Sequence, residues 1–343
     1  MKNVSIQFVE MLFENPLEIL EFEKLQSHGN MTVIPIIYKG KTLEFISVKK
    51  AEELGLININ ETDTVSQLEV INNSNKQVLI PFGVTVHGGK QDRTIWEPIL
   101  LASGGKQDIS GANKGVMEQK YTVPAKCVEQ SRWNYRKGKG FKSSNTRLHP
   151  TVAFAAISSV GQGAVWNEIQ AYRSEMKYNA NIAPTQSYLE MTENIEKETE
   201  KIVNSFKNLE DQCGIATFIN GEFIGIEFYA NTQVWEEMSQ DIVKAFAIES
   251  LRFKDKSINE KSEINKAQLI TALQSLKLKF TSRKGIGLGE VVEFESEDKK
   301  WRGNTLVQEN SCVQFYIVSK RGGSTQTNER EQFFQTNISQ RYI

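Results

Sequence analysis

The clearest structural signal in the chain is a hairpin pattern in its second half. Two strand-forming segments, GIATFI and EFIGIEFY, flank the pair Asn220-Gly221, and Asn-Gly suits the type I′ turn that matches the twist of antiparallel strands. Strand patterns begin at residue 31, helical patterns lie on both sides of the hairpin, and strand patterns return near residue 277. Because strands and helices are grouped rather than alternating, the sequence predicts an α+β fold, with mostly antiparallel mixed sheets and helices inserted in the second half.

The length of 343 residues allows one large domain or two ordinary ones. Nothing near residues 150–160 has the composition of a free linker. We therefore expect a single extended domain over residues 1–320, with a β-rich first half at about 30–150 and a helix-rich second half at about 150–320. The polar residues 321–343 are predicted to form a mobile tail.

Composition argues against several classes of protein. The formal net charge is −1, which gives the whole chain no bias toward nucleic acid or membranes, and no apolar run approaches the roughly 18 residues of a membrane span. The N-terminus carries Glu10 and Glu14 and lacks a small-residue cleavage site, so no signal peptide is predicted. Three distant cysteines without a CxxC pair favour reduced thiols. We therefore expect a cytoplasmic protein with no membrane partner.

Local patterns predict the elements around the polar segments. Residues 76–86 and residues 94–102 each have the pattern of one strand, although Pro98 indicates an edge position or a bulge in the second. Residues 121–129 have a third strand pattern. Ser47 is predicted to cap a short helix that ends at Gly55. In the second half, the pattern predicts a long helix over about 186–208 and another helix capped by Thr232. The polar segments therefore follow strand ends in the first half of the chain.

The first candidate site is the turn that follows the first of these strands. His87 falls on the face opposite the apolar residues of the strand, and Gly88 and Gly89 come directly after it. Adjacent glycines let backbone N–H groups approach an anion, and Lys90 and Arg93 supply positive charge. The same pattern also fits a β-turn that needs positive φ, surrounded by exposed charges. Neither the P-loop spacing nor a GxGxxG fingerprint is present in this turn.

The second candidate site is the segment 127–133. Cys127 beside cations is a candidate nucleophile, although a lone strand cysteine is more often a small buried hydrophobe. Glu129, on the same strand face, could serve as an acid or base, accept a ligand hydroxyl, or pair with Arg132 or Arg93. The segment predicts polar chemistry at a strand end and leaves open which group takes part.

A third candidate is the basic stretch 130–148, which has several cations, no acid and the aromatic residues Trp133, Tyr135 and Phe141. Cations interleaved with aromatic rings are typical of a surface for single-stranded nucleic acid, or of a clamp on a nucleotide diphosphate. A solvated loop explains most of these residues better. The stretch therefore supports a nucleic-acid partner less strongly than a small-molecule one.

Metal-ligand patterns are weak. The chain has three histidines and no HExxH motif or CxxC pair, which argues against zinc. A Mg²⁺ site through Asp92, Glu129 or Glu97 has no support from spacing. We predict no metal site, and the sequence names no cofactor.

The two polar segments also resemble a known family, the ADP-ribosylglycohydrolase (ARG)- and rhodanese/phosphatase-superfamily-associated protein domain. Its members carry a strand that enters a G-G-K-Q-[ND]-R turn, matched here by residues 88–93, and a V-x-C-V-E-x-x-R-W segment, approximated by residues 125–133. The helix with Trp166, the helix start at residues 185–187 and the hairpin are similar as well. The resemblance covers roughly residues 30–255 and the closing strands to about residue 318.

Three departures from the family pattern are visible. Asp92 stands where asparagine is common, which changes the charge that a ligand would meet there. Ala125 replaces a more apolar residue near the cysteine, and residues 103–121 look like an insertion.

The resemblance implies a role in NAD- or ADP-ribose-linked metabolism and assigns no reaction. We therefore expect the domain to bind ADP-ribose, NAD or a related nucleotide, and whether it also processes this ligand as an enzyme stays open. Another protein of an ADP-ribose pathway is a candidate partner. The candidate catalytic residues are Glu129, Asp92 and His87, with Cys127 as a candidate nucleophile, and the candidate ligand-binding residues are Gly88, Gly89, Lys90, Gln91, Arg93, Arg132 and Trp133.

Each group has an expected role in this nucleotide hypothesis. Lys90 and Arg93 would hold the diphosphate together with the glycine backbone, and Trp133 would stack on a base. Glu129 would hold a ribose hydroxyl or act as a base, and Asp92 would bring a cation or orient Arg93.

Two other functions remain open from the sequence. In the first, the domain is a non-enzymatic interaction module, and Arg93, Glu129 and Arg132 form a structural ionic network. In the second, residues 130–148 bind single-stranded nucleic acid, with an affinity that falls steeply as salt rises.

Overall fold

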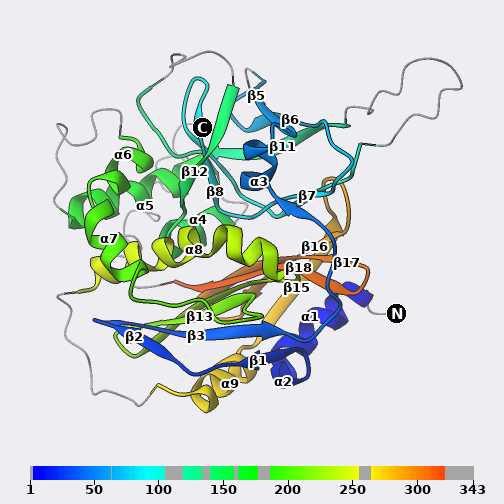
Figure 1. Ribbon diagram of the computed structural model, residues 1–343. Helices are drawn as coiled ribbons and strands as arrows, with labels where there is room; N and C mark the ends of the chain where they lie inside the picture. Colours follow the sequence, from blue (N-terminus) through cyan, green and yellow to red (C-terminus); the bar gives the residue numbers. More distant parts are fainter. Residues whose placement is uncertain are drawn as a thin grey trace, which may run out of the picture.

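The computed structural model describes residues 3–62, 64–104, 119–132, 134, 140–157, 161–176, 186–254 and 264–320 (Figure 1). Its strands pair mainly in antiparallel fashion, and helices lie between and beside the sheets. The predicted α+β class is confirmed. In the described part of the chain, no helix combines the length and the apolar character that crossing a membrane requires.

Nine of the described strands form one antiparallel sheet, the lower layer in Figure 1. In spatial order its strands are β1 (Leu20–Phe22), β3 (Met31–Tyr38), β13 (Gly214–Ile219), β14 (Glu222–Tyr229), β18 (Ser311–Ser319), β17 (Trp301–Gln308), β16 (Glu290–Ser296) and β15 (Leu278–Lys284), and β2 (Gln26–His28) pairs with β3. The predicted hairpin is confirmed as β13 and β14, where Asn220 and Gly221 have positive φ angles of 54° and 81°. Pairing of β14 with β18 joins this hairpin to the C-terminal strands.

Helices cover both faces of the large sheet. On the outer face lie α1 (Val4–Glu14), α2 (Pro16–Ile19) and α9 (Lys266–Ser275). There Phe13 of α1 and Leu269 of α9 share one apolar cluster with the sheet. On the other side lie α4 (Pro150–Ile157), α5 (Gln162–Glu175), α6 (Tyr188–Glu193), α7 (Glu196–Val203) and the long α8 (Thr232–Arg252).

A smaller β-structure lies beyond α8, at the top of Figure 1. The strands β11 (Gln119–Cys127), β6 (Gln67–Asn72), β5 (Ile57–Glu61), β12 (Gly140–Arg147), β8 (Val84–Gly88) and β9 (Arg93–Ile95) close a barrel in this order. Beside it, β10 (Ile99–Leu101), β7 (Val78–Ile80) and β4 (Ile46–Ser47) form a small sheet, and α3 (Val48–Glu53) is capped by Ser47 as its sequence suggests. One apolar cluster joins Val70 of the barrel, Trp235 of α8 and Ile215 of the large sheet.

Two segments predicted as single strands are each divided in two. Residues 76–86 form β7 and β8, which belong to different sheets because the chain turns at residues 81–83, where Gly83 has a φ of 79°. Residues 94–102 form β9 and β10, which are separated by three residues ending in a proline. Proline has no backbone N–H with which to continue a ladder. The single-strand predictions are wrong, because apolar alternation continues across turns that move the chain to another sheet.

The basic stretch 130–148 is only partly a loop. Its residues 140–147 form β12, which closes the barrel between β5 and β8. Phe141 and Arg147 on this strand are buried. The prediction of a solvated loop is therefore wrong for residues 140–147, and the nucleic-acid hypothesis loses two of its surface residues. Most of β12 is polar, which explains why periodicity does not reveal it.

Two helix predictions also need correction. The long helix expected over 186–208 is the pair α6 and α7, with a break at Asn194 and Ile195. The cap of α8 is Asn231 rather than Thr232, because the Asn231 side chain accepts a hydrogen bond from the Val234 N–H at 3.2 Å. Asparagine is as good an N-cap as threonine, so the sequence did not decide between these neighbours.

A buried ionic cluster fastens the barrel to the large sheet. Arg147, at the end of β12, lies 2.7 Å from Glu227 Oε1 and donates a hydrogen bond to the Tyr229 hydroxyl at 2.8 Å. Gln314 on β18 donates to Glu227 Oε1 at 2.8 Å and accepts from the Phe82 N–H at 2.8 Å. These residues are all buried, so the charges find their partners inside the protein rather than in water.

Replacing Arg147 by methionine is expected to lower the free energy of unfolding by about 3–5 kcal/mol, because Glu227 would stay buried without its charge partner. Urea denaturation followed by circular dichroism measures this change. The matched control is Lys41→Met, since the Lys41–Glu309 pair has side chains that are 58% and 55% exposed, and exposed pairs contribute little. Equal losses of stability in the two variants would contradict the role given to Arg147.

Candidate functional site

The two polar segments meet at one end of the barrel. Residues 88–93 link the neighbouring strands β8 and β9, and Cys127 at the end of β11 pairs directly with Arg93 at the start of β9. Just beyond β11, Glu129 forms an isolated bridge with Ser187 at the start of α6. Strand order therefore brings together residues that lie about forty positions apart in the sequence.

Asp92 is the centre of this cluster and is fully buried. Its Oδ1 lies 3.0 Å from His87 Nδ1 and 3.3 Å from Arg132 Nη2, and its Oδ2 accepts from the Ser187 hydroxyl at 3.0 Å. Its backbone N–H donates to Glu129 Oε2 at 3.0 Å. One buried carboxylate thus ties together the turn, the end of β11 and the start of α6.

Glu129 and Arg132 form the second part of the cluster. Arg132 Nε lies 2.9 Å from both oxygens of buried Glu129, and Arg132 Nη2 lies 2.7 Å from Oε2. Arg132 Nη1 donates to the carbonyls of Gly89 and Asn134 at 2.9 Å and 2.7 Å. Of the roles that the sequence leaves open for Glu129, the structure contains the ion pair with Arg132. This pair also fixes the backbone of the glycine turn.

The backbone N–H groups of the turn hydrogen-bond within the protein. The Gly88 N–H donates to Asp92 Oδ1 at 3.3 Å, and the Lys90 N–H donates to Glu61 Oε2 at 3.2 Å. The φ angles of Gly88 and Gly89 are 138° and 47°, values that residues with a Cβ atom rarely adopt. A Cβ atom at Gly89 would lie 2.2 Å from the Phe141 ring. Close packing against β12 therefore requires glycine here.

Arg93 and Gln91 lie deeper than the sequence suggests. Both are buried, and Arg93 Nη1 donates to the carbonyl and the Oε1 atom of Gln91 at 3.0 Å and 3.4 Å. Gln91 Nε2 in turn donates to the Glu129 carbonyl at 2.9 Å. Arg93 Nη2 lies 3.6 Å from Glu61 Oε2. Arg93 therefore sits among protein groups rather than at the molecular surface.

Cys127 has the environment of a buried thiol. Its Sγ atom donates to Gln91 Oε1 at 3.1 Å, and its backbone N–H and carbonyl are both held by the Gln162 amide at 2.7 Å. Burial raises the pKa of the Cys127 thiol to about 11, with Arg93 opposing that rise. A thiol in this state supplies very little thiolate at neutral pH.

Basic side chains lie at or near the surface of this barrel end, whereas its interior holds the buried ionic cluster. The His87 side chain is 45% exposed. Lys142 on β12 is exposed and pairs directly across from His87, so the two side chains share a face. Lys90 is half-buried. Trp133 lies outside the described residues.

Sequence patterns did not single out three members of the site. Lys142 belongs to the stretch expected to be a loop, and its position opposite His87 depends on strand pairing. Ser187 and Glu61 come from distant segments and carry no motif signal of their own. A strand assignment for 140–147 alone would not have placed Lys142 opposite His87, because β8 and β12 are separated in the sequence by β9, β10 and β11 and their register depends on tertiary pairing.

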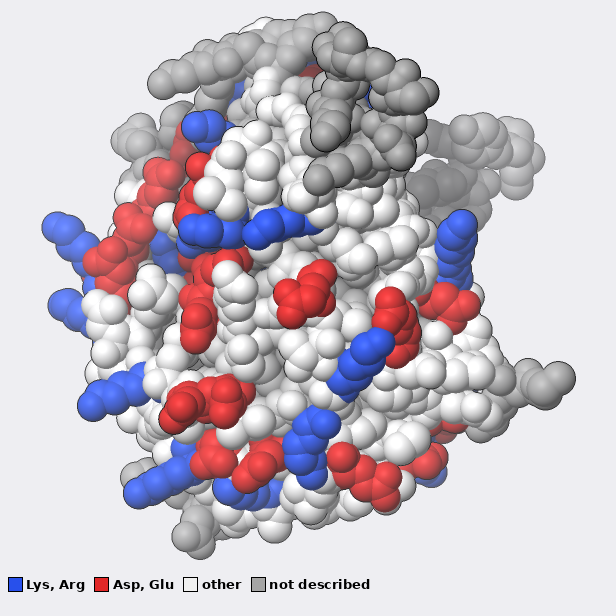
Figure 2. Space-filling model, turned by 45° about the vertical axis from the view of Figure 1, so that its right-hand side comes forward, with Lys and Arg blue, Asp and Glu red and all other residues white. Residues whose placement is uncertain are grey.

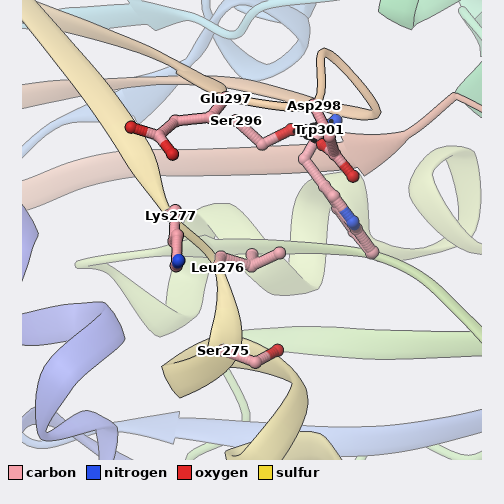
Figure 3. A pocket seen from close by; sticks show the side chains of 7 residues that line it. All are labelled: Ser275, Leu276, Lys277, Ser296, Glu297, Asp298 and Trp301. Carbon is pink, nitrogen blue, oxygen red and sulfur yellow. Dashed lines mark hydrogen bonds between the residues drawn. The ribbon is translucent and has the colours of Figure 1, made fainter.

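Two further observations delimit the site. Among the described residues, no group of three or more His, Cys, Asp or Glu side chains is arranged to hold a metal ion. A surface hollow of about 360 Å³ lies elsewhere, where α9 leads into β15 and β16 turns into β17 (Figure 3). It is lined by Ser275, Leu276, Lys277, Ser296, Glu297, Asp298 and Trp301. It shares no residue with the cluster at the barrel end.

Cys127 is expected to resist alkylation in the folded protein. With a pKa of about 11, roughly one thiol in ten thousand is ionised at pH 7, so the rate should rise about tenfold per pH unit up to pH 10. Peptide-resolved mass spectrometry after iodoacetamide treatment measures this rate. The control is the same protein in urea, where Cys127 should react like an ordinary thiol. Rapid labelling of folded Cys127 at pH 7 would contradict this expectation and restore it as a candidate nucleophile.

A family model described as ARPP-1, the ARG and Rhodanese-Phosphatase-superfamily-associated Protein domain, matches residues 19–112 and 116–318. The match includes both polar segments of the site and extends over most of the chain. No curated protein and no solved structure matches the chain. The resemblance inferred from the turn at 88–93 and the segment at 125–133 is confirmed. The chain therefore belongs to the ARG and Rhodanese-Phosphatase-superfamily-associated Protein domain family, whose name associates it with ADP-ribosylglycohydrolase and rhodanese-phosphatase proteins.

Proposed function

We propose that the barrel end around His87 binds a nucleotide of the ADP-ribose or NAD type. The observation that carries this proposal is the close contact between buried Asp92 and half-exposed His87, 3.0 Å from Oδ1 to Nδ1. A carboxylate on one ring nitrogen fixes the orientation and tautomer of an imidazole. A fully buried carboxylate thus holds a surface histidine in one orientation.

Positive charge next to His87 supports an anionic ligand. Lys142 lies directly across the strand pair from His87 and is exposed, and half-buried Lys90 follows the glycines of the turn. Ammonium groups beside an imidazole suit the oxygens of a diphosphate. The association of the family with ADP-ribosylglycohydrolases supports a nucleotide that carries ADP-ribose.

In this proposal the buried charges position the residues that meet the ligand. Asp92 orients His87, while Glu129 holds Arg132 against the carbonyls of the turn. Because the Glu129 oxygens already accept hydrogen bonds from Arg132 and the Asp92 N–H, we assign Glu129 to positioning rather than to base catalysis. The pair of His87 and Asp92 is the one arranged for proton transfer to or from the ligand. Base stacking by Trp133, a cytoplasmic location and a protein partner stay predictions from the sequence.

Substitution of His87 by alanine is expected to weaken ADP-ribose binding at least tenfold, because the ligand would lose its contact with the oriented imidazole. A tenfold change in affinity corresponds to about 1.4 kcal/mol of binding free energy. Isothermal titration calorimetry with ADP-ribose and with NAD measures the affinities. The matched control is His28→Ala, because His28 is exposed on β2 of the large sheet, away from the barrel. If the wild-type protein binds neither nucleotide, or if both variants bind as the wild type does, the proposal fails.

A second candidate function is a non-enzymatic interaction module in which the cluster is purely structural. The observation that favours it is the complete burial of Asp92 and Glu129, both of which pair with Arg132. Surfaces outside the cluster would then carry the interaction. The charged residues on the face shown in Figure 2 are of both signs and interspersed, so charge on that face does not single out a partner.

Glu129→Gln separates the structural contribution from the binding contribution. Removing this buried charge leaves Arg132 without its main partner and is expected to lower the free energy of unfolding by about 3 kcal/mol. Glu309→Gln is the matched control at an exposed ion pair and should leave stability essentially unchanged. Chemical denaturation measures both variants. A Glu129→Gln protein with normal stability and lost nucleotide binding would rule out the purely structural module.

A further inference from the structure

An ion pair crosses the interior of the barrel beneath the glycine turn. In the closed order of its six described strands, β5 and β9 lie on opposite sides of the ring. Glu61 on β5 and Arg93 on β9 nevertheless approach to 3.6 Å. Strands that are not neighbours can come this close only through side chains that point into the interior. Glu61 also follows Ile57 and Ile59 on the buried face of β5.

This ion pair has hydrogen-bonding capacity that the described residues do not use. Arg93 Nη1 is engaged by Gln91, whereas Arg93 Nε and Nη2 and Glu61 Oε1 have no hydrogen-bond partner among the described residues. All three atoms are buried. Leaving a buried donor or acceptor unsatisfied is energetically unfavourable. The structure therefore has a place where an additional polar group would be stabilised.

The arrangement of the unused atoms specifies the group that fits. The Nε–H and one Nη2–H of a guanidinium point along the same edge and form a two-pronged donor. Glu61 Oε1 beside this edge is an acceptor. Arg93 and Glu61 balance each other in charge, and the neighbouring Cys127 thiol is neutral because burial raises its pKa to about 11. A neutral group that both accepts and donates fits this set, whereas an anion would face the Glu61 carboxylate.

We propose that the barrel interior receives a hydroxyl group of the ribose that follows the diphosphate in ADP-ribose, which accepts from the Arg93 edge and donates to Glu61 Oε1. This inference rests on the proposed nucleotide function, and it specifies which part of the nucleotide the barrel interior recognises. A nucleotide with a second ribose beyond the diphosphate is thereby distinguished from ADP, which lacks that sugar.

The glycine turn lies directly over this position. The Lys90 N–H donates to Glu61 Oε2 at 3.2 Å, and the Gly89 N–H donates to the Gly140 carbonyl at 3.3 Å. A Cβ at Gly89 would lie 2.9 Å from Glu61 Oε2, so the turn rests directly on the ion pair. His87 and Lys90 flank the same turn, and a ligand held by its diphosphate at these residues has its sugar next to the barrel interior.

The test compares two ligands that differ by one sugar. Isothermal titration calorimetry with ADP-ribose and with ADP is expected to show at least tenfold tighter binding of ADP-ribose to the wild-type protein, because a site built for a hydroxyl discriminates against its absence. Arg93→Lys, which lacks the two-pronged edge, should bring the affinity for ADP-ribose down to that for ADP. Glu61→Gln provides a second variant, with a reduced preference, if Arg93→Lys does not fold. Thermal melts establish which variants are folded.

The possible outcomes separate this inference from the proposed function. Equal affinities of the wild-type protein for ADP and ADP-ribose, both lowered by His87→Ala, would overturn the sugar site and leave the nucleotide function standing. Binding of inorganic phosphate that is lost in Arg93→Lys would overturn it in favour of an anion site. If neither nucleotide binds, both proposals fail together. A preference for ADP-ribose that Arg93→Lys abolishes supports the sugar site.

Discussion

The buried pairing of Arg147 with Glu227 is the constraint on which the rest of the structure depends. It connects β12 of the barrel to β14 in the middle of the large sheet, and Gln314 extends it to β18. Apolar packing alone is non-directional, so it does not determine which barrel strand faces the sheet. Charged hydrogen bonds have directions and partners. The cluster therefore sets how the barrel is oriented on the layer below it.

The strand β12 connects this ionic cluster to the functional site. β12 runs from Gly140, whose carbonyl accepts from the Gly89 N–H, to Arg147, which pairs with Glu227 of the large sheet. Between these ends it places Phe141 against the glycine turn and Lys142 opposite His87. A strand fixed at one end by an ion pair and at the other by the turn has little freedom to slide. The site is thus linked to the large sheet through β12, although no residue of that sheet belongs to it.

Sequence reasoning succeeded where the determining interactions are local. The Asn220-Gly221 turn and the Ser47 cap depend on residues within a few positions of each other, and both were predictable. It failed where the determining partner is distant. Apolar alternation cannot reveal that the chain leaves one sheet at Gly83, because the pattern continues on the other side. The two polar motifs predicted a composite site, but the partners Ser187 and Glu61 required strand order.

The cost of the buried charges bears on what the barrel end is for. Buried ion pairs are often no more stable than apolar residues of the same volume, so stability alone is a weak reason for Asp92, Arg93, Glu129 and Arg132 at one end of a small barrel. Their arrangement creates two features that an apolar core could not provide. One is a surface histidine held by a buried carboxylate, and the other is an arginine edge facing the barrel interior with hydrogen bonds still to make. Both features lie next to the same glycine turn, which is where a ligand would contact the protein.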